Sequence, residues 1–173
     1  MPRDVSPDAE GALPVLSERL ARAAVSGAVD ATLTLPHAQR QKSRQRVRLD
    51  DGREVAIWLT AGPGLRDGDR LAGDGLCVEV RAAAEEISVA RCDDPLTLAR
   101  TCYHLGNRHV PLQVGVGEAR YLGDPVLDAM ARKQGARVER AELPFEPEPG
   151  AYAGGHSHGE GAHGHDTKHS HDD

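Results

Sequence analysis

Histidine is the residue type whose number and spacing in this chain point most directly to chemistry. Six of the nine histidines form three pairs whose members are one residue apart: His156 and His158, His163 and His165, and His169 and His171. Neutral imidazole is a ligand for nickel, copper and zinc, and His-rich tracts bind metals because of their composition. An expression tag is usually an unbroken run of histidines, whereas these pairs are spaced and mixed with acidic residues. The pattern indicates a native metal-binding segment but does not identify the metal.

The residues around these pairs favour a mobile tail. Only Gly, Ser, Ala, Thr, Lys and acidic residues lie between the pairs, and a Pro/Gly-rich stretch precedes them. Such a segment cannot bury enough apolar surface to offset its ordering entropy. We expect residues 147–173 to be a disordered tail that loads and releases metal without the opening of a domain.

A further histidine, His109, lies where a predicted helix gives way to a predicted strand. Asp94 is a suitable N-cap and Pro95 a suitable first residue for a helix over 95–105. Gly106 and Asn107 tolerate the left-handed conformation that ends a helix, and residues 110–116 are typical of a strand. A lone histidine after a turn is more often a hydrogen-bonded structural residue than a metal ligand. Residue type alone therefore leaves the role of His109 open.

Residues 13–81 are predicted to form a small β domain after a disordered extension, residues 1–12. Residues 13–31 are Ala-rich and could hold a helical turn. The β pattern predicts strands over 32–35, 40–49, 53–60 and 76–81. Asp51-Gly52 predicts a two-residue hairpin. Val55, Ile57 and Leu59 should face the core, and Trp58 should be partly buried in packing.

Five basic residues alternate along the second of these strands: Arg40, Lys42, Arg44, Arg46 and Arg48. An extended chain would place them on one face. That row could be a docking surface for an acidic partner. A solvated outer strand face is the commoner meaning of such a row, and it is the preferred interpretation.

Residues 82–146 carry the order β-α-β-β-α-β, which is typical of a ferredoxin-like domain. The expected elements are strand 87–91, helix 95–105, strand 110–116, strand 119–122, helix 125–134 and strand 137–143. The predicted buried residues of the first helix are Pro95, Leu96, Leu98, Ala99, Cys102, Tyr103 and Leu105, with Thr101 and His104 opposite. Those of the second helix are Val126, Leu127, Met130 and Ala131. The predicted fold class is α+β.

Composition and motifs exclude several classes of protein. The net charge is −6, which argues against a general nucleic-acid binder. No apolar run approaches ~18 residues and no signal peptide is recognisable, so neither a membrane segment nor secretion is expected. Three cysteines without a Cys-x-x-Cys pair fit free thiols in a reducing, cytoplasmic environment. No catalytic motif is present, so we do not expect an enzyme.

The segment from Tyr103 to Gln113 closely resembles the signature of UreE, the family of urease accessory nickel chaperones. The resemblance extends from about residue 14 to the end of the chain. It includes Gln41–Arg44, Leu49–Val55, Leu65–Asp69, Leu143–Glu148 and the His-rich tail. No single piece is decisive, but their occurrence in this order is highly specific.

The resemblance implies a two-domain homodimer that binds Ni(II) and passes it to the urease accessory GTPase and the apo-urease assembly complex. It identifies His109 as the central nickel ligand, and a twofold axis would bring two such side chains together. His104, on the predicted polar face of its helix, is expected to form hydrogen bonds behind the metal site. His37 is expected to be a loop residue. Residues 122–125 carry no histidine where some family members have them, so a secondary surface metal site is not expected there.

Two other classes of function compete with a chaperone. A cytosolic storage or buffering protein for nickel, zinc or copper would explain the tail but not the two-domain body, and imidazole ligands would also accept Zn(II) or Cu(II) in vitro. An RNA-binding module would use the basic row on a ferredoxin-like scaffold, yet the chain lacks the paired strand aromatics that stack on bases. Delivery of Ni(II) for assembly of the urease active site is the preferred interpretation.

Overall fold

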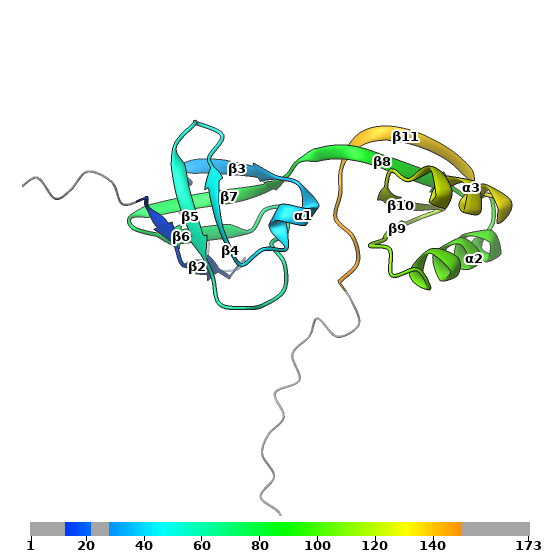
Figure 1. Ribbon diagram of the computed structural model, residues 1–173, viewed down its shortest axis with the longest axis horizontal. Coiled ribbons are helices and arrows are strands. Elements are labelled where there is room, and N and C mark those ends of the chain that lie inside the picture. Colours follow the sequence, from blue (N-terminus) through cyan, green and yellow to red (C-terminus); the bar gives the residue numbers. More distant parts are fainter. Residues whose placement is uncertain (1–12, 22–27, 150–173) are drawn as a thin grey trace, which may run out of the picture.

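A computed structural model of the protein describes residues 13–21 and 28–149. The fold is α+β, and its two halves lie side by side, joined where β7 runs into β8 (Figure 1). The predicted disorder of residues 1–12 and of most of the tail falls outside the described residues. Residues 147–149 are described, and Pro147 is buried rather than part of a free tail. No helix in the described ranges is long and apolar enough to cross a membrane.

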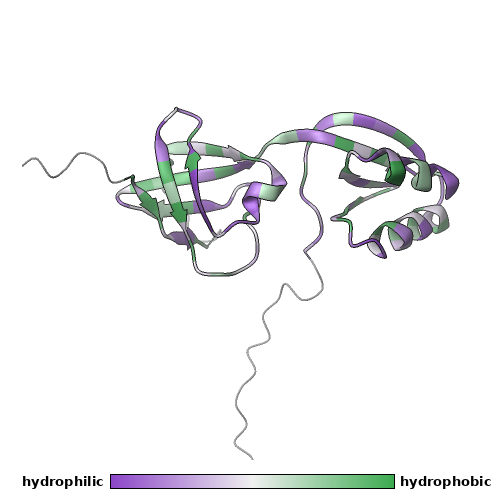
Figure 2. Ribbon diagram, viewed as in Figure 1, coloured by the Kyte–Doolittle hydropathy of each residue, from purple (hydrophilic) through white to green (hydrophobic). Residues whose placement is uncertain are grey.

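The N-terminal half consists of two sheets that pack face to face. One sheet has the order β1-β5-β4 and the other the order β2-β6-β7-β3. The bounds are β1 Val15–Leu16, β2 Glu18–Leu20, β3 Ala31–Leu35, β4 Arg44–Arg48, β5 Glu54–Trp58, β6 Arg70–Gly73 and β7 Leu76–Ala82, with a short helix α1, His37–Arg40, between β3 and β4. Alternate residues of these strands meet in one aliphatic core, including Leu16, Leu33, Val55, Ile57 and Val80. Hydrophobic and hydrophilic residues accordingly follow one another along the strands (Figure 2).

Several local predictions for this half are wrong. Residues 15–20 form strands β1 and β2 rather than a helical turn, because β1 pairs with β5 and β2 with β6, which sequence neighbours do not reveal. The predicted strand over 40–49 begins only at Arg44. The hairpin turn has three residues, 50–52, because the N–H of Leu49 donates to the carbonyl of Arg53 over 2.8 Å. Gly52 then takes a φ of 92°, which a side chain would strain.

The C-terminal half is a four-stranded antiparallel sheet with the order β11-β8-β10-β9. Its elements are β8 Ala84–Arg91, α2 Pro95–Gly106, β9 Gln113–Gly115, β10 Glu118–Leu122, α3 Pro125–Lys133 and β11 Arg137–Pro144. Both helices cover the same face of the sheet (Figure 1). Connection and strand order are those of a ferredoxin-like fold, as the sequence pattern predicted.

The N-caps of both helices and the glycine after α3 are where the sequence placed them. The Asp94 carboxylate accepts the N–H groups of Leu96 and Thr97, each over 2.9 Å, which stabilises the start of α2. Asp124 does the same for α3, and Gly135, with φ 98°, follows the end of that helix. These local signals are strong because a cap needs only a few neighbouring residues.

The buried faces of the two helices differ from the predicted ones. On α2, Leu105 is buried as predicted, but so is Thr101, which the pattern predicted on the opposite face, whereas Leu96 and Tyr103 are 58% and 65% exposed. On α3, Asp128 is buried and Val126 is exposed. Each helix contacts the sheet through one stripe, so apolar residues at the edge of the predicted arc lie in solvent. Asp128 tolerates burial because Tyr121 and Arg140 donate hydrogen bonds to its carboxylate.

Candidate metal site

His109 is the last residue of the tight turn that follows α2. Its N–H donates to the carbonyl of Gly106 over 2.8 Å, and the N–H of Arg108 donates to that of Leu105 over 3.0 Å. The left-handed residue here is His109 itself, with φ 56°, whereas Asn107 stays right-handed with φ −63°. The predicted place of the left-handed residues is therefore wrong by two positions. An L-residue in this conformation costs on the order of 1 kcal/mol, and such residues are frequent at functional sites.

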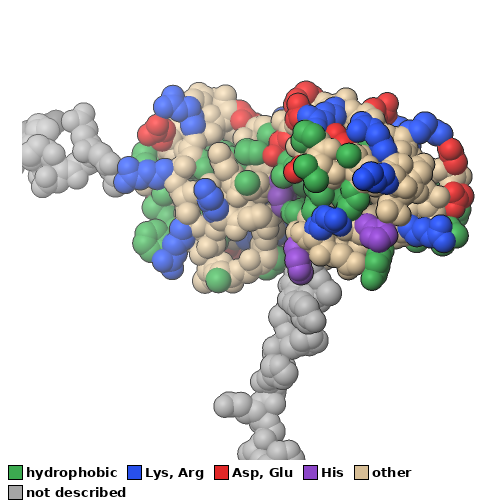
Figure 3. Space-filling model, turned by 45° about the vertical axis from the view of Figure 1, so that its right-hand side comes forward, with side chains coloured by type: hydrophobic (Ala, Val, Ile, Leu, Met, Phe, Trp, Pro, Cys, Tyr) green, Lys and Arg blue, Asp and Glu red, His purple; other side chains and the backbone are tan. Residues whose placement is uncertain are grey.

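The side chain of His109 is exposed at the surface and lacks a set of companion ligands among the described residues. No group of three or more His, Cys, Asp or Glu side chains among residues 13–21 and 28–149 could hold a metal ion. Histidine side chains are visible at the molecular surface among Lys or Arg and hydrophobic side chains (Figure 3). A metal bound at His109 must take its other ligands from the tail, from water or from a second subunit.

His104 lies one and a half turns of helix before His109 and is half-buried. Its ring meets the ring of Tyr103 edge-on, with centroids 5.4 Å apart, and its carbonyl accepts a hydrogen bond from Arg108 over 3.2 Å. No hydrogen bond joins the rings of His104 and His109 in the described part of the chain. A hydrogen-bonding role for His104 behind the metal stays a prediction.

Cys102 is the other potential metal ligand on α2. Burial raises the pKa of its thiol, and the neighbouring Cys92 raises it further. The thiolate is the form that binds metals, so a raised pKa disfavours Cys102 as a ligand near neutral pH. The chemistry of this end of α2 therefore depends on imidazole.

The chain returns to the neighbourhood of His109 just before the tail begins. The N–H of Glu148 donates to the carbonyl of Leu112 over 2.8 Å, and the N–H of Glu146 donates to the side-chain oxygen of Gln113 over 3.0 Å. Leu112 is three residues after His109 in the sequence. The six tail histidines, His156 to His171, lie outside the described residues, whose last stretch, 147–149, includes this contact with Leu112.

The basic row divides into two parts that the sequence did not distinguish. Arg44, Arg46 and Arg48 are exposed on β4, whereas Arg40 is buried at the end of α1. Trp58 is 57% exposed, so its predicted packing role is wrong. It lies opposite Arg44 in the strand register, and the guanidinium sits 4.7 Å above its ring. This cation–π contact stabilises an exposed tryptophan without burying it.

Comparison with known proteins decides the family. Residues 15–83 match the model of the UreE urease accessory protein, N-terminal domain, and residues 85–172 match that of the C-terminal domain. The chain belongs to the UreE family. The urease accessory protein UreE of Alkalilimnicola ehrlichii is 62% identical over 140 residues, which cover 80% of this chain and 84% of that protein. UreE of Escherichia coli O157:H7 is 54% identical over 144 residues, covering 82% and 90%, and UreE of Citrobacter koseri is 57% identical over 137 residues, covering 76% and 90%.

Membership of the UreE family fixes the general role of the protein. It is a chaperone of urease maturation and not an enzyme, and it acts with the urease maturation machinery. The two matched regions meet between residues 83 and 85, where β7 passes into β8.

Proposed function

We propose that the protein is a homodimeric nickel metallochaperone that delivers Ni(II) for assembly of the urease active site. Ni(II) is its cargo, and the urease accessory GTPase, in complex with apo-urease, is the recipient. The observation that carries the proposal is the His109 turn: an exposed imidazole, held in a strained conformation, that belongs to no three-ligand group among residues 13–21 and 28–149. One imidazole is too few ligands to hold a metal ion tightly, but two chains that bring their His109 side chains together would form a metal site.

A symmetric dimer supplies the missing ligands. In a twofold dimer the same patch occurs on both subunits, so a His109 near the axis faces its copy. The C-terminal half supports an interface, because α2 exposes Leu96 and Tyr103 along its length and the turn after β9 exposes Val116; of these, Tyr103 is nearest in the chain to the His109 turn. Burying these side chains against a second subunit would stabilise the dimer by roughly 25 cal/mol per Å² of apolar surface.

The tail completes the proposed ligand set. From Glu148 to His156 the chain has eight residues, and a flexible chain of that length reaches roughly 15 Å from its start. Because Glu148 is bonded at Leu112, the first pair of tail histidines starts within reach of the His109 turn. Neutral imidazole also binds Zn(II) and Cu(II), so the tail is expected to take these ions in vitro.

Nickel titration calorimetry on the full-length protein tests the proposal, with His109→Ala compared with His104→Ala. Removal of a direct ligand should weaken the tightest nickel event by more than about a hundredfold, since even residues behind a metal ligand are worth 10–100-fold. His104→Ala, in the helix that precedes the turn, is the matched control and should cost about tenfold, the lower end of that range. Both variants should remain dimeric by light scattering. Unchanged tight binding by His109→Ala would refute the assignment.

A further inference from the structure

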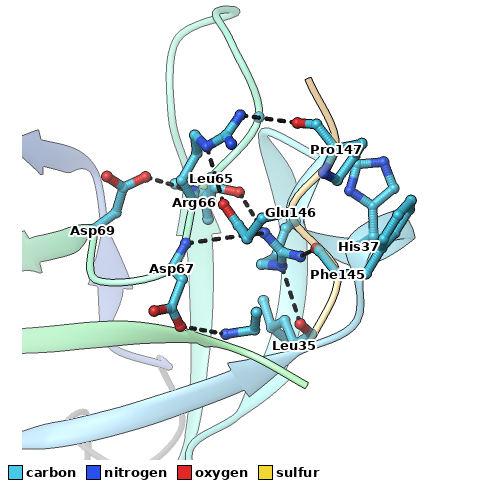
Figure 4. Close-up of polar contacts among 12 residues, drawn as sticks. Leu35, His37, Leu65, Arg66, Asp67, Asp69, Phe145, Glu146 and Pro147 are labelled. Carbon is cyan, nitrogen blue, oxygen red and sulfur yellow. Dashed lines mark hydrogen bonds and ion pairs between the residues drawn. The ribbon is translucent and has the colours of Figure 1, made fainter. Parts of the chain in front are cut away.

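The segment that links β11 to the tail passes between the two halves of the molecule and is bonded to both. It leaves the edge strand β11 at Pro144 and reaches the opposite edge of the sheet, where Glu146 and Glu148 bond to Gln113 and Leu112 beside β9. On the way its side chains enter the N-terminal half (Figure 4). We call Arg40, Arg66 and Glu146 the domain clamp.

Arg40 provides the buried part of the domain clamp. Its side chain is only 1% exposed, and its guanidinium donates to the carbonyls of Leu35 and Leu65, each over 3.2 Å. It also donates to the carbonyl of Phe145 and to the carboxylate of Glu146. Each nitrogen of the guanidinium thus has an acceptor, and a buried guanidinium needs such partners because an unpaired charge inside a protein is very costly. Two of its four acceptors come from the segment before the tail.

Arg66 and Asp67 hold Glu146 from a second side. The Nε of Arg66 lies 3.0 Å from the second carboxylate oxygen of Glu146, and its Nη1 donates to the carbonyl of Pro147 over 3.2 Å. The N–H of Asp67 donates to Glu146 over 3.3 Å. Among the described residues, the carboxylate of Glu146 thus accepts from Arg40, Arg66 and Asp67 of the N-terminal half, while its N–H donates to Gln113 of the C-terminal half.

Phe145 adds an apolar contact across the same boundary. Its ring is buried with Ile87 and Val89 of β8, on the face of the sheet away from the helices. The ring of His37, from α1, meets it edge-on with centroids 5.4 Å apart (Figure 4). Position 146 is therefore fixed by an apolar anchor on one side and two arginines on the other.

We propose that Glu146, held by Arg40 and Arg66, is a positioning residue for metal handling: the domain clamp keeps the start of the tail beside the His109 turn. The N-terminal half thereby takes part in metal binding without supplying a ligand. This inference rests on the proposed function, in which tail histidines and His109 share nickel.

The expected size of the effect follows from chain geometry. Without the clamp, the last anchored residue is Phe145, next to the end of β11, a strand that lies three strand spacings or about 14 Å from β9. The free chain up to His156 grows from about 8 to about 11 residues. The greater length and the displaced start together lower the local concentration of tail imidazole at the His109 turn by about fourfold.

The first test uses full-length, metal-free protein and measures hydrogen exchange of the Glu148 N–H by NMR. Glu146→Gln should speed this exchange by about tenfold or more, because a charge-assisted contact is lost. Arg66→Gln removes the partly exposed partner and serves if Glu146→Gln folds poorly. Glu142→Gln, on the exposed side of β11, is the matched control and should leave exchange unchanged. Unchanged protection of Glu148 in both clamp variants would overturn the inference.

The second test measures the tightest nickel affinity of the same variants in two full-length backgrounds: native, and with all six tail histidines changed to alanine. A positioning role predicts an affinity about fourfold weaker in the native background and no change in the alanine background. An equal loss in both backgrounds, or none in either, would overturn the inference. A wild-type protein without a His109-dependent nickel event would refute the proposed function instead, while the exchange measurement still decides whether the clamp holds the tail.

Discussion

Polar side chains are buried and paired at the boundary between the two halves, whereas the turn after α2 exposes its histidine to solvent. At the boundary, Arg40 is buried and its donors have acceptors, and His37 packs against Phe145. At the turn, His109 is exposed, strained at φ 56° and without companion ligands among residues 13–21 and 28–149. Each region has a histidine near a helix terminus: His37 is the first residue of α1, and His109 follows the end of α2 by three residues. The surroundings, and not the residue type, make His37 a structural histidine and His109 a candidate ligand.

Changing Arg40 to methionine should cause the largest loss of unfolding free energy among the proposed substitutions. The substitution leaves the carboxylate of Glu146 and three carbonyl groups without their buried partner, and breaking such a pair costs about 3–5 kcal/mol of unfolding free energy. Urea denaturation measures this loss. Arg44→Met on the exposed face of β4 is the control, and it should cost less than about 1 kcal/mol. Equal losses of unfolding free energy for the two variants would contradict the claim that Arg40 is structurally different from the exposed arginines of β4.

The pH dependence of stability should next reveal the surroundings of His37. Burial lowers the pKa of His37 below its ordinary 6.5, and the positive charge of Arg40 lowers it further, while Glu85 and Glu146 oppose the shift. The folded state therefore favours the neutral ring. Its contribution to stability is complete above pH 6.5 and is lost as the pH falls through the lowered pKa.

His37→Gln should accordingly flatten the fall in the urea midpoint of metal-free protein between pH 7 and pH 5. Gln39→Ala, at an exposed and non-titrating position of α1, is the control and should keep the wild-type profile. A pH profile of His37→Gln that matched the wild type would show that burial at the boundary does not favour the neutral form of His37.

The smallest expected effect concerns backbone strain at the turn. His109→Gly removes the side chain that opposes a φ of 56°, which gains on the order of 1 kcal/mol, and a more flexible unfolded chain offsets part of that gain. The variant should unfold at the wild-type temperature or slightly above it, yet lose tight nickel binding. His109→Ala keeps the strain and should unfold at a lower temperature than His109→Gly. A clear destabilisation by glycine would show that the imidazole supports the fold.

Local signals explain what the sequence predicted well. Asp94-Pro95, Asp124-Pro125 and Gly135 set the ends of α2 and α3, and the order of these elements gave the ferredoxin-like half. The predictions that failed concern residues whose partners are far away in the sequence. The acceptor of Arg40, Glu146, is 106 residues away, so its alternation with Arg44 and Arg46 suggested a strand face. The short strands β1 and β2 exist only through pairing with β5 and β6.

The candidate site was predictable only in part. The residue His109 came from a resemblance, while its left-handed backbone depends on a turn in which Gly106 remains helical and accepts its N–H. The anchoring of the segment before the tail was missed, because a Pro/Gly-rich stretch is usually a linker. Phe145, the only phenylalanine of the chain, next to Glu146 was the available signal, since an aromatic beside an acidic residue is unusual in a disordered segment.

A mixed dimer tests the central claim, a nickel site shared between two His109 side chains, most directly. Wild-type and His109→Ala chains carrying different affinity tags can be co-expressed, and the dimer with one chain of each kind isolated and titrated with nickel. A shared site predicts that one alanine suffices: the mixed dimer should lose the tightest event almost as completely as the double variant. A mixed dimer that keeps that event at unchanged affinity would show that each His109 works within its own subunit, contrary to this account.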